Sequence, residues 1–146
     1  MSATNSMETA ILQLYFNNTD HANIGDAAGL QNSASAGSFY ISLHTADPTE
    51  TGSQTSSEAT YTSYARVAVA RSGAGWTVSG ANASNAAAIN FPACTGGTNS
   101  ITHFGIGSDA SGAGNLFFKG ALGATLSVSS GITPSFAIGE LDVNLD

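Results

Sequence analysis

Short segments in which apolar and polar residues alternate, each followed by a turn signal, constrain the fold of this chain most. In one of them, Phe39, Ile41 and Leu43 are apolar and the positions between them are more polar. Successive side chains of a strand point to opposite faces of a sheet, so a period of two predicts a strand with one buried face. Gly, Pro, Asn and Ser residues typical of turns separate the segments. We expect about eight strands, at residues 39–44, 64–71, 76–78, 87–91, 101–107, 116–122, 126–128 and 136–145.

Glycines predict how two of these segments connect. Residues 73–75 have the sequence Gly-Ala-Gly and stand directly between the segments 64–71 and 76–78. A short glycine-containing connection between two alternating segments is typical of a β-hairpin. We therefore expect these two strands to pair with each other.

The last segment changes the phase of its alternation. Its apolar residues have even numbers up to Ile138 and odd numbers from Leu141 onward. A strand cannot move its apolar side chains to the other face without an extra residue. The pattern predicts a β-bulge near residues 139–140.

One segment near the N-terminus has the spacing of a helix. Asn5 is the candidate N-cap, and Glu8 stands three residues later, as in a capping box. The apolar residues that follow the helical spacing are Met7, Ala10, Ile11, Leu14 and Tyr15. We expect a helix over residues 7–16 that either covers the sheet core or docks on a partner protein.

Together these elements define a fold class. No helical segment lies between the predicted strands, so parallel βαβ units are excluded. We predict a mostly β chain, an antiparallel two-sheet β-sandwich with a jelly roll as one arrangement, preceded by one N-terminal α-helix. The chain of 146 residues has the length of a single domain. We expect one domain over 1–146, with a helix and arm at 1–20 and the β-sandwich at 38–146.

The charge of the chain excludes several classes of partner. The net charge is −7, and the three cations Arg66, Arg71 and Lys119 are dispersed. Binding to nucleic acid requires cations that neutralise phosphates, and anionic membrane surfaces attract clusters of them. We expect no direct binding to nucleic acid and none to membranes. The sequence also has no targeting signal and no apolar run of the ~18 residues that a membrane span needs.

The residues that could carry chemistry lack the spacing that chemistry needs. Cys94 is the only cysteine and fits a small residue at a strand end. His44 and Asp47 lie beside a turn, and no further histidine or cysteine follows at the spacing of a zinc site. The carboxylates fall in turns or on outward positions, where solvated acids are expected. We therefore expect no catalytic residues, no cofactor and no bound metal; an enzyme would require His44, His103 and an acid in one pocket.

Contact with other proteins is the remaining possibility. The alternation places four aromatic residues outward or in loops, and aromatic residues are enriched in interface cores. With the apolar helix positions they form a set of candidate partner or oligomer contacts: Met7, Ile11, Leu14, Tyr15, Tyr40, Tyr61, Tyr64 and Phe117.

Five stretches in a fixed order resemble a known family. They are LHTADP at 43–48, YARVAV at 64–69, SNAAAINFP at 84–92, THFGIG at 102–107 and GAGNL at 112–116. From about Phe39 to the C-terminus the chain resembles small bacteriophage virion proteins that are labelled either tail-fibre-like proteins or capsid cement and decoration proteins. The resemblance implies a structural virion component without enzymatic activity.

The two labels imply different partners. A capsid cement protein would be a dimer or trimer on the outer capsid surface, assembled in the host cytoplasm, and would bridge subunits of the major capsid protein. A tail or tail-fibre protein would take part in host attachment. The sequence has neither the repeats nor the coiled-coil stem of an elongated fibre, and its negative charge favours the outside of a DNA-filled shell. These arguments favour the cement role, with the fibre role as the alternative.

Overall fold

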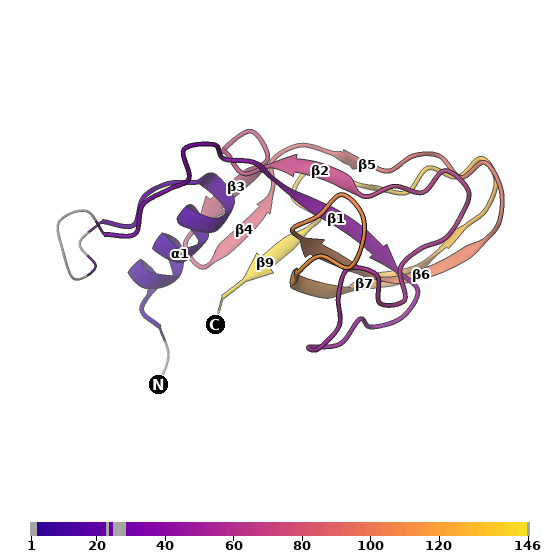
Figure 1. Cartoon of the computed structure of the whole chain (residues 1–146), viewed down its shortest axis with the longest axis horizontal. Coiled ribbons are helices and arrows are strands. Elements are labelled where there is room, and N and C mark those ends of the chain that lie inside the picture. The colour runs from indigo at the N-terminus through magenta and orange to yellow at the C-terminus, as the bar shows by residue number, and fades with distance from the viewer. Residues whose placement is uncertain (1–2, 23, 25–28, 146) are drawn as a thin grey trace. The chain divides into compact units, whose positions relative to one another are not determined.

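The computed structural model describes residues 3–22, 24 and 29–145, which form one helix and nine strands. The pairs β1–β6, β6–β7, β3–β4 and β4–β9 are antiparallel. The predicted mostly β class with one N-terminal helix is therefore confirmed, whereas the jelly-roll arrangement stays a prediction. The elements are α1 (Asn5–Asn17), β1 (Ser38–His44), β2 (Val67–Ala70), β3 (Trp76–Ser79), β4 (Asn82–Asn85), β5 (Ile89–Asn90), β6 (Asn99–Gly107), β7 (Leu116–Val128), β8 (Ser135–Phe136) and β9 (Asp142–Asn144) (Figure 1).

The chain divides into two compact units, each built from segments that are distant in sequence. Unit 1 comprises residues 1–38, 70–88 and 136–146, and unit 2 comprises residues 39–69 and 89–135. The sheets have the strand orders β3-β4-β9, β2-β1-β6-β7 and β5-β8. The prediction of one domain over 1–146 stays a prediction. No helix among the described residues is long and apolar enough to cross a membrane.

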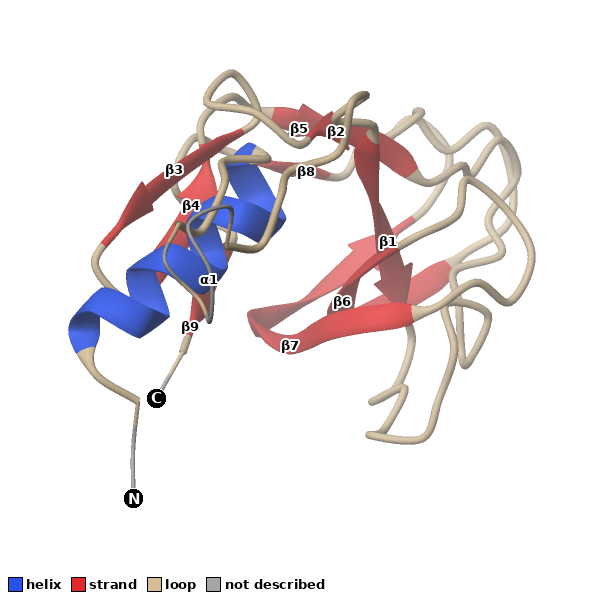
Figure 2. Ribbon diagram, turned by 60° about the vertical axis from the view of Figure 1, so that its left-hand side comes forward, coloured by secondary structure: helices blue, strands red, loops and turns tan. Residues whose placement is uncertain are grey.

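Unit 1 is a three-stranded sheet covered by α1. The helix contacts β3 and β4 (Figure 2). At the contact the rings of Phe16 and Trp76 meet edge to face, with centroids 4.6 Å apart, and both side chains are fully buried. An edge-to-face pair adds to the burial of two large apolar side chains. This pair and the fully buried Leu12 anchor the helix to the sheet.

The inner face of α1 differs from the prediction. The buried residues of the helix are Glu8, Leu12 and Phe16, which are spaced four apart, whereas Met7 is 41% exposed and Tyr15 is 44% exposed. The remaining predicted positions Ala10, Ile11 and Leu14 are half-buried. The helix is rotated because the largest apolar side chain, Phe16, packs on Trp76 and determines which face turns inward.

The ends of α1 also differ from the prediction. Thr4, and not Asn5, is the N-cap, and its Oγ1 accepts a hydrogen bond from the backbone N–H of Met7 at 3.4 Å. The helix ends at Asn18, whose φ of 53° is left-handed and whose N–H bonds to the carbonyl of Gln13. Both caps satisfy backbone groups that the helix itself leaves unpaired.

Unit 2 contains the four-stranded sheet, and the alternating apolar residues of β1 lie in its core. Phe39, Ile41 and Leu43 of β1 are buried, as predicted, together with Ile101 and Ile106 of β6. The predicted strands 116–122 and 126–128 form one strand, β7, whose pairing with β6 shifts register between them. Because β6 is the only neighbour of β7 in this sheet, β7 is an edge strand.

The predicted hairpin and the predicted bulge are both wrong. β2 belongs to the four-stranded sheet and β3 to the three-stranded one, so the turn at 73–75 joins strands that do not pair. Residues 137–140 form a turn and not a bulge, with the N–H of Glu140 bonded to the carbonyl of Ala137 at 3.2 Å. Gly139 supplies the positive φ of 75° in that turn. The phase changes there because one strand ends and another begins in a different sheet.

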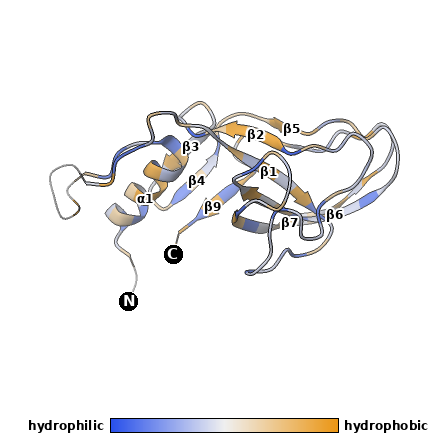
Figure 3. Ribbon diagram, in the orientation of Figure 1, coloured by the Kyte–Doolittle hydropathy of each residue, from blue (hydrophilic) through white to orange (hydrophobic). Residues whose placement is uncertain are grey.

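Strand β4 has no counterpart in the sequence prediction. Its residues Asn82–Asn85 are polar apart from Ala83, and β4 is pale to blue in Figure 3, whereas β2 is orange. Asn85 is nevertheless buried, and its side chain bonds to the backbone of Ala87, Ala137 and Leu141. A buried amide with all these partners replaces the apolar side chain expected at an inward position.

Candidate functional site

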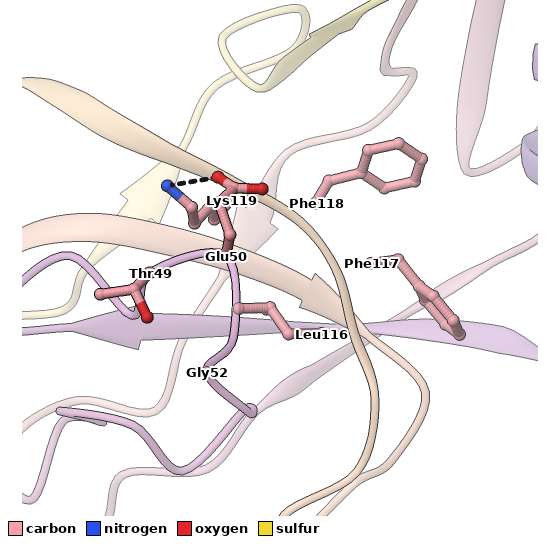
Figure 4. A pocket seen from close by; sticks show the side chains of 7 residues that line it. All are labelled: Thr49, Glu50, Gly52, Leu116, Phe117, Phe118 and Lys119. Atoms are coloured by element: carbon pink, nitrogen blue, oxygen red, sulfur yellow. Dashed lines mark ion pairs between the residues drawn. The ribbon is translucent and has the colours of Figure 1, made fainter.

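A shallow pocket of about 110 Å³ lies beside the start of β7 in unit 2. Loop 45–52, which follows β1, forms one side and the first residues of β7 form the other (Figure 4). We call it the Phe117 pocket, and its lining residues are Thr49, Glu50, Gly52, Leu116, Phe117, Phe118 and Lys119. Its volume is well below the ~300 Å³ at which enclosed ligand pockets begin, so it offers a surface subsite.

A register shift in the sheet projects the ring of Phe117. Phe118 pairs with Ile106 and Leu116 pairs with Gly107, so Phe117 is one extra residue on β7. A bulge of this kind redirects a side chain. Phe117 is 44% exposed, and its ring packs edge to face on that of Phe39, with ring centroids 5.8 Å apart. The exposed side chain of Phe117 therefore packs against a second aromatic ring, that of Phe39.

Glu50 and Lys119 are the charged residues of the pocket lining, and Lys119 also pairs with Asp47, which is outside the lining. The Nζ of Lys119 lies 3.1 Å from a carboxylate oxygen of Asp47 and 3.1 Å from one of Glu50. These two hydrogen bonds raise the pKa of Lys119. The pKa of Asp47 is lowered, first by the backbone N–H of Thr49 and then by Lys119. Asp47 accepts that N–H at 2.8 Å, as a turn residue before proline does.

A second hollow, of about 290 Å³, lies over a buried ion pair in the same unit. The guanidinium of Arg66 donates to both carboxylate oxygens of Glu58, at 2.6 and 2.8 Å. The side chain of Arg66 is only 2% exposed and that of Glu58 is 16% exposed, so the expectation of solvated carboxylates is wrong for Glu58. Further hydrogen bonds join Arg66 to the carbonyls of Asp109 and Gly112. Because this pairing already uses the polar groups of the hollow, we assign them a structural role.

Tyr64 completes this network. Its hydroxyl donates to Glu58 at 3.0 Å and accepts the backbone N–H of Leu43 at 3.0 Å. Burial raises the pKa of Tyr64 far above its ordinary value. Tyr61 beside it is 3% exposed, and its hydroxyl donates to the carbonyl of Pro92, so the loop position predicted for it is a core position. Burial raises the pKa of Tyr61 to about 12.

The histidines of the enzyme alternative lie opposite each other without forming an open site. His44 and His103 face each other in the β1–β6 register. His44 is fully buried, with Nδ1 2.8 Å from the carbonyl of Ser56 and Nε2 2.8 Å from the hydroxyl of Ser42. Since a carbonyl only accepts, Nδ1 carries the proton and Nε2 accepts from Ser42. Burial is the main cause that lowers the pKa of His44.

Among the described residues, neither Cys94 nor the metal-ligating residue types form a candidate catalytic or metal site. Cys94 is buried, and its thiol donates to the carbonyl of Gly96 at 3.2 Å; it lies between β5 and β6, and not at the strand end predicted for it. Within residues 3–22, 24 and 29–145, no three His, Cys, Asp or Glu side chains come together in a way that could hold a metal ion.

The remaining candidate contacts lie at different places. Phe117 is in the pocket described above, Tyr40 of β1 is half-buried, and the exposed Met7 and Tyr15 belong to α1 in unit 1. Their contact with a partner stays a prediction.

Comparison with known families identifies the kind of protein to which this site belongs. The model of the family described as "Podophage GP4 fiber I protein gp80" matches residues 2–144. The chain belongs to this family. It is accordingly a structural protein of a phage virion, and the resemblance to small phage virion proteins is confirmed. A search of curated proteins gave no match.

For this member of the fiber I protein family, sequence reasoning found only part of the site. Phe117 was a candidate because alternation placed it outward. Glu50 and Lys119 were not, since they are 69 positions apart in the chain and nothing local predicts their ion pair. Two features could have indicated them: Glu50 lies in a turn, and Lys119 lies on the same strand as Phe117.

Proposed function

We propose that this chain is a structural subunit of a phage fibre and takes part in attachment to the host. The observation that carries the proposal is the match of residues 2–144 to a family whose description names a fiber protein. The exposed Phe117 side chain supports it, because contact surfaces are enriched in aromatic residues. In this role no catalytic step is required of the chain.

The second candidate is the capsid cement role. One observation favours it: α1, the only helix of the described residues, has 13 residues, which is less than two heptads of a coiled-coil stem. A cement protein would sit on the outer capsid surface, bridge major capsid protein subunits, and act as a dimer or trimer. Its many copies would allow each contact to be weak.

Copy number and location in the particle separate the two roles. Quantitative mass spectrometry of purified virions, with the major capsid protein as internal standard, gives the copy number. Immunogold labelling of intact particles gives the location. A fibre subunit is expected at a small fraction of the copies of the major capsid protein, with label on the tail. Comparable copy numbers together with label on the head would overturn the fibre proposal in favour of the cement role.

A further inference from the structure

We propose that strand β7 pairs with the β7 of a second copy of this chain, antiparallel over residues 120–128. The four-stranded sheets of the two copies then form one continuous sheet. The inference goes beyond the attachment role and does not depend on it. Neither the family description nor the two candidate roles name a surface through which copies meet.

The length of β7 distinguishes it from the other edge strands of the larger sheets. β2 and β3 have four residues each and β9 has three, whereas β7 has 13. β7 forms the margin of its sheet opposite β2 (Figure 2). An edge strand presents a row of backbone N–H and C=O groups that can pair with another chain, and short length is one of the features that prevent such pairing. β7 does not have this protection.

The second part of β7 also lacks the protection that side chains can give. Residues 120–128 contain no charged residue and no proline, which are the residues that commonly block edge-to-edge pairing. Ala121, residues 123–125 and Ser127 are exposed. A Cβ added at Gly123 would meet no described atom within 4 Å. The side chains of this segment therefore leave room for an approaching strand.

An irregularity in the β6–β7 ladder leaves backbone groups of the same segment without a ladder position. His103 pairs with Ala121 and Ile101 pairs with Leu126, so that one residue of β6 stands opposite four residues of β7. One residue carries one N–H and one C=O, which are too few for the backbone groups of four residues. Three of these four residues are exposed, and a second strand can therefore reach the backbone groups that β6 does not bind.

Charge favours an uncharged segment as the contact between copies. Each copy carries a net charge of −7, so two copies repel each other over most of their surfaces. The three cations of the chain are all engaged within it: Arg66 with Glu58, Lys119 with Asp47, and Arg71 with the carbonyl of Tyr15. One copy therefore offers no unengaged cation to the carboxylates of another. Hydrogen bonds between two uncharged edges avoid this repulsion.

Identical strands in an antiparallel pair are related by a two-fold axis. Full overlap of residues 120–128 places this axis at Ala124, with Thr125 of each copy beside Gly123 of the other. A contact of this symmetry closes on itself and gives a dimer, not a filament. One strand pair buries less surface than the ~1,600 Å² of a standard interface, so we expect a dissociation constant of about 10 µM to 1 mM. Many copies on one particle would compensate for this weak affinity.

The test is sedimentation equilibrium of the full chain from roughly 10 µM to 1 mM, the range that brackets the expected dissociation constant. We expect a monomer–dimer equilibrium. Over the same range, ¹H–¹⁵N NMR should show concentration-dependent shifts of the amides of Ala121, Gly123 and Thr125, and none for Ala68 of the opposite edge strand β2. Added salt should tighten the dimer, because it screens the repulsion between two acidic copies.

Two variants of equal net charge separate a local contact from a general effect of charge. Thr125→Glu places a carboxylate of each copy beside the two-fold axis and should raise the dissociation constant about tenfold or more. Thr77→Glu adds the same charge at an exposed threonine of the edge strand β3 in unit 1, and should raise it less than about threefold. The far-UV circular dichroism of both variants should match that of the parent chain.

Several outcomes would overturn the inference. They are a monomer at every concentration, an equal effect of the two glutamate variants, a dimer that salt weakens, or concentration-dependent shifts at α1 or β2 in place of β7. These results are independent of the location in the virion. A β7 dimer in a head-located protein would refute the fibre proposal alone, and a fibre-located protein that stays monomeric would refute this inference alone.

Discussion

Gly105 of β6 lies where a methyl group would meet three side chains, and replacing it by alanine tests how the core of unit 2 is packed. A Cβ at this position would stand 2.7 Å from Cδ1 of Leu116, 2.7 Å from Oγ of Ser42 and 2.8 Å from Nε2 of His44. The Leu116 methyl group is the end of a flexible side chain and can move. Ser42 and His44 are fully buried and hydrogen-bonded to each other, so they cannot move independently.

The expected loss of stability follows from these contacts. Overpacking a well-filled core costs about 1–3 kcal/mol. Separating Ser42 from His44 leaves a buried ring nitrogen without its donor, which costs about 1–3 kcal/mol more. The lower entropy of the unfolded alanine variant offsets about 0.4–1 kcal/mol. We therefore expect Gly105→Ala to lower the free energy of unfolding by about 1–6 kcal/mol.

Urea denaturation followed by far-UV circular dichroism at neutral pH measures this change. Gly123 of β7 provides the matched control, because a Cβ there meets no atom within 4 Å. Gly123→Ala should change the free energy of unfolding by less than about 0.5 kcal/mol. An equal loss in the two variants, or a loss below about 0.5 kcal/mol in Gly105→Ala, would refute the proposed packing of Ser42 and His44 against β6.

Three further predictions concern His44, the buried ion pair and α1. Because burial lowers the pKa of His44 from 6.5, the unfolded chain binds a proton that the folded chain does not, and the Tm should fall as the pH decreases below about 6.5. His44→Asn should flatten that part of the Tm profile; the same slope in both proteins would contradict the assignment. Glu58→Gln removes the carboxylate from a guanidinium that is 2% exposed and should lower the free energy of unfolding in urea by about 3 kcal/mol, whereas a loss under about 1 kcal/mol would indicate a solvated pair. Phe16→Ala should lower the free energy of unfolding by about 3–5 kcal/mol and Tyr15→Ala by less than about 0.5 kcal/mol. The opposite order would indicate that α1 buries the face that the sequence predicts.

The strands that the sequence predicts well are those whose burial follows directly from alternation. In β1 the residues Phe39, Ile41 and Leu43 are all buried, as the alternation predicts, although Ser42 and His44 on the opposite face are buried as well. There one local pattern carries the whole signal.

Elements whose burial depends on distant partners were predicted wrongly. Apolar spacing alone could not orient α1, because the position of Phe16 is decided by Trp76, 60 residues later in the chain. It could not find β4, because buried Asn85 is satisfied by the backbone of Ala137 and Leu141 from the C-terminal segment. The information that fixes these elements is three-dimensional and absent from any local window.

The same distinction between local and long-range signals applies to the candidate site. Buried polar residues that no local pattern indicates connect the loops beside it. Gln54 is fully buried, and its side-chain oxygen accepts the backbone N–H of Asp109 at 2.9 Å. The backbone N–H of Gln54 donates to the carbonyl of Ala113 at 2.9 Å, and Arg66 binds the same loop through two carbonyls. This loop leads directly into Leu116 and the bulge of β7. Buried polar side chains therefore join the loop after β1 to the loop before β7, and local sequence patterns do not indicate these long-range hydrogen bonds.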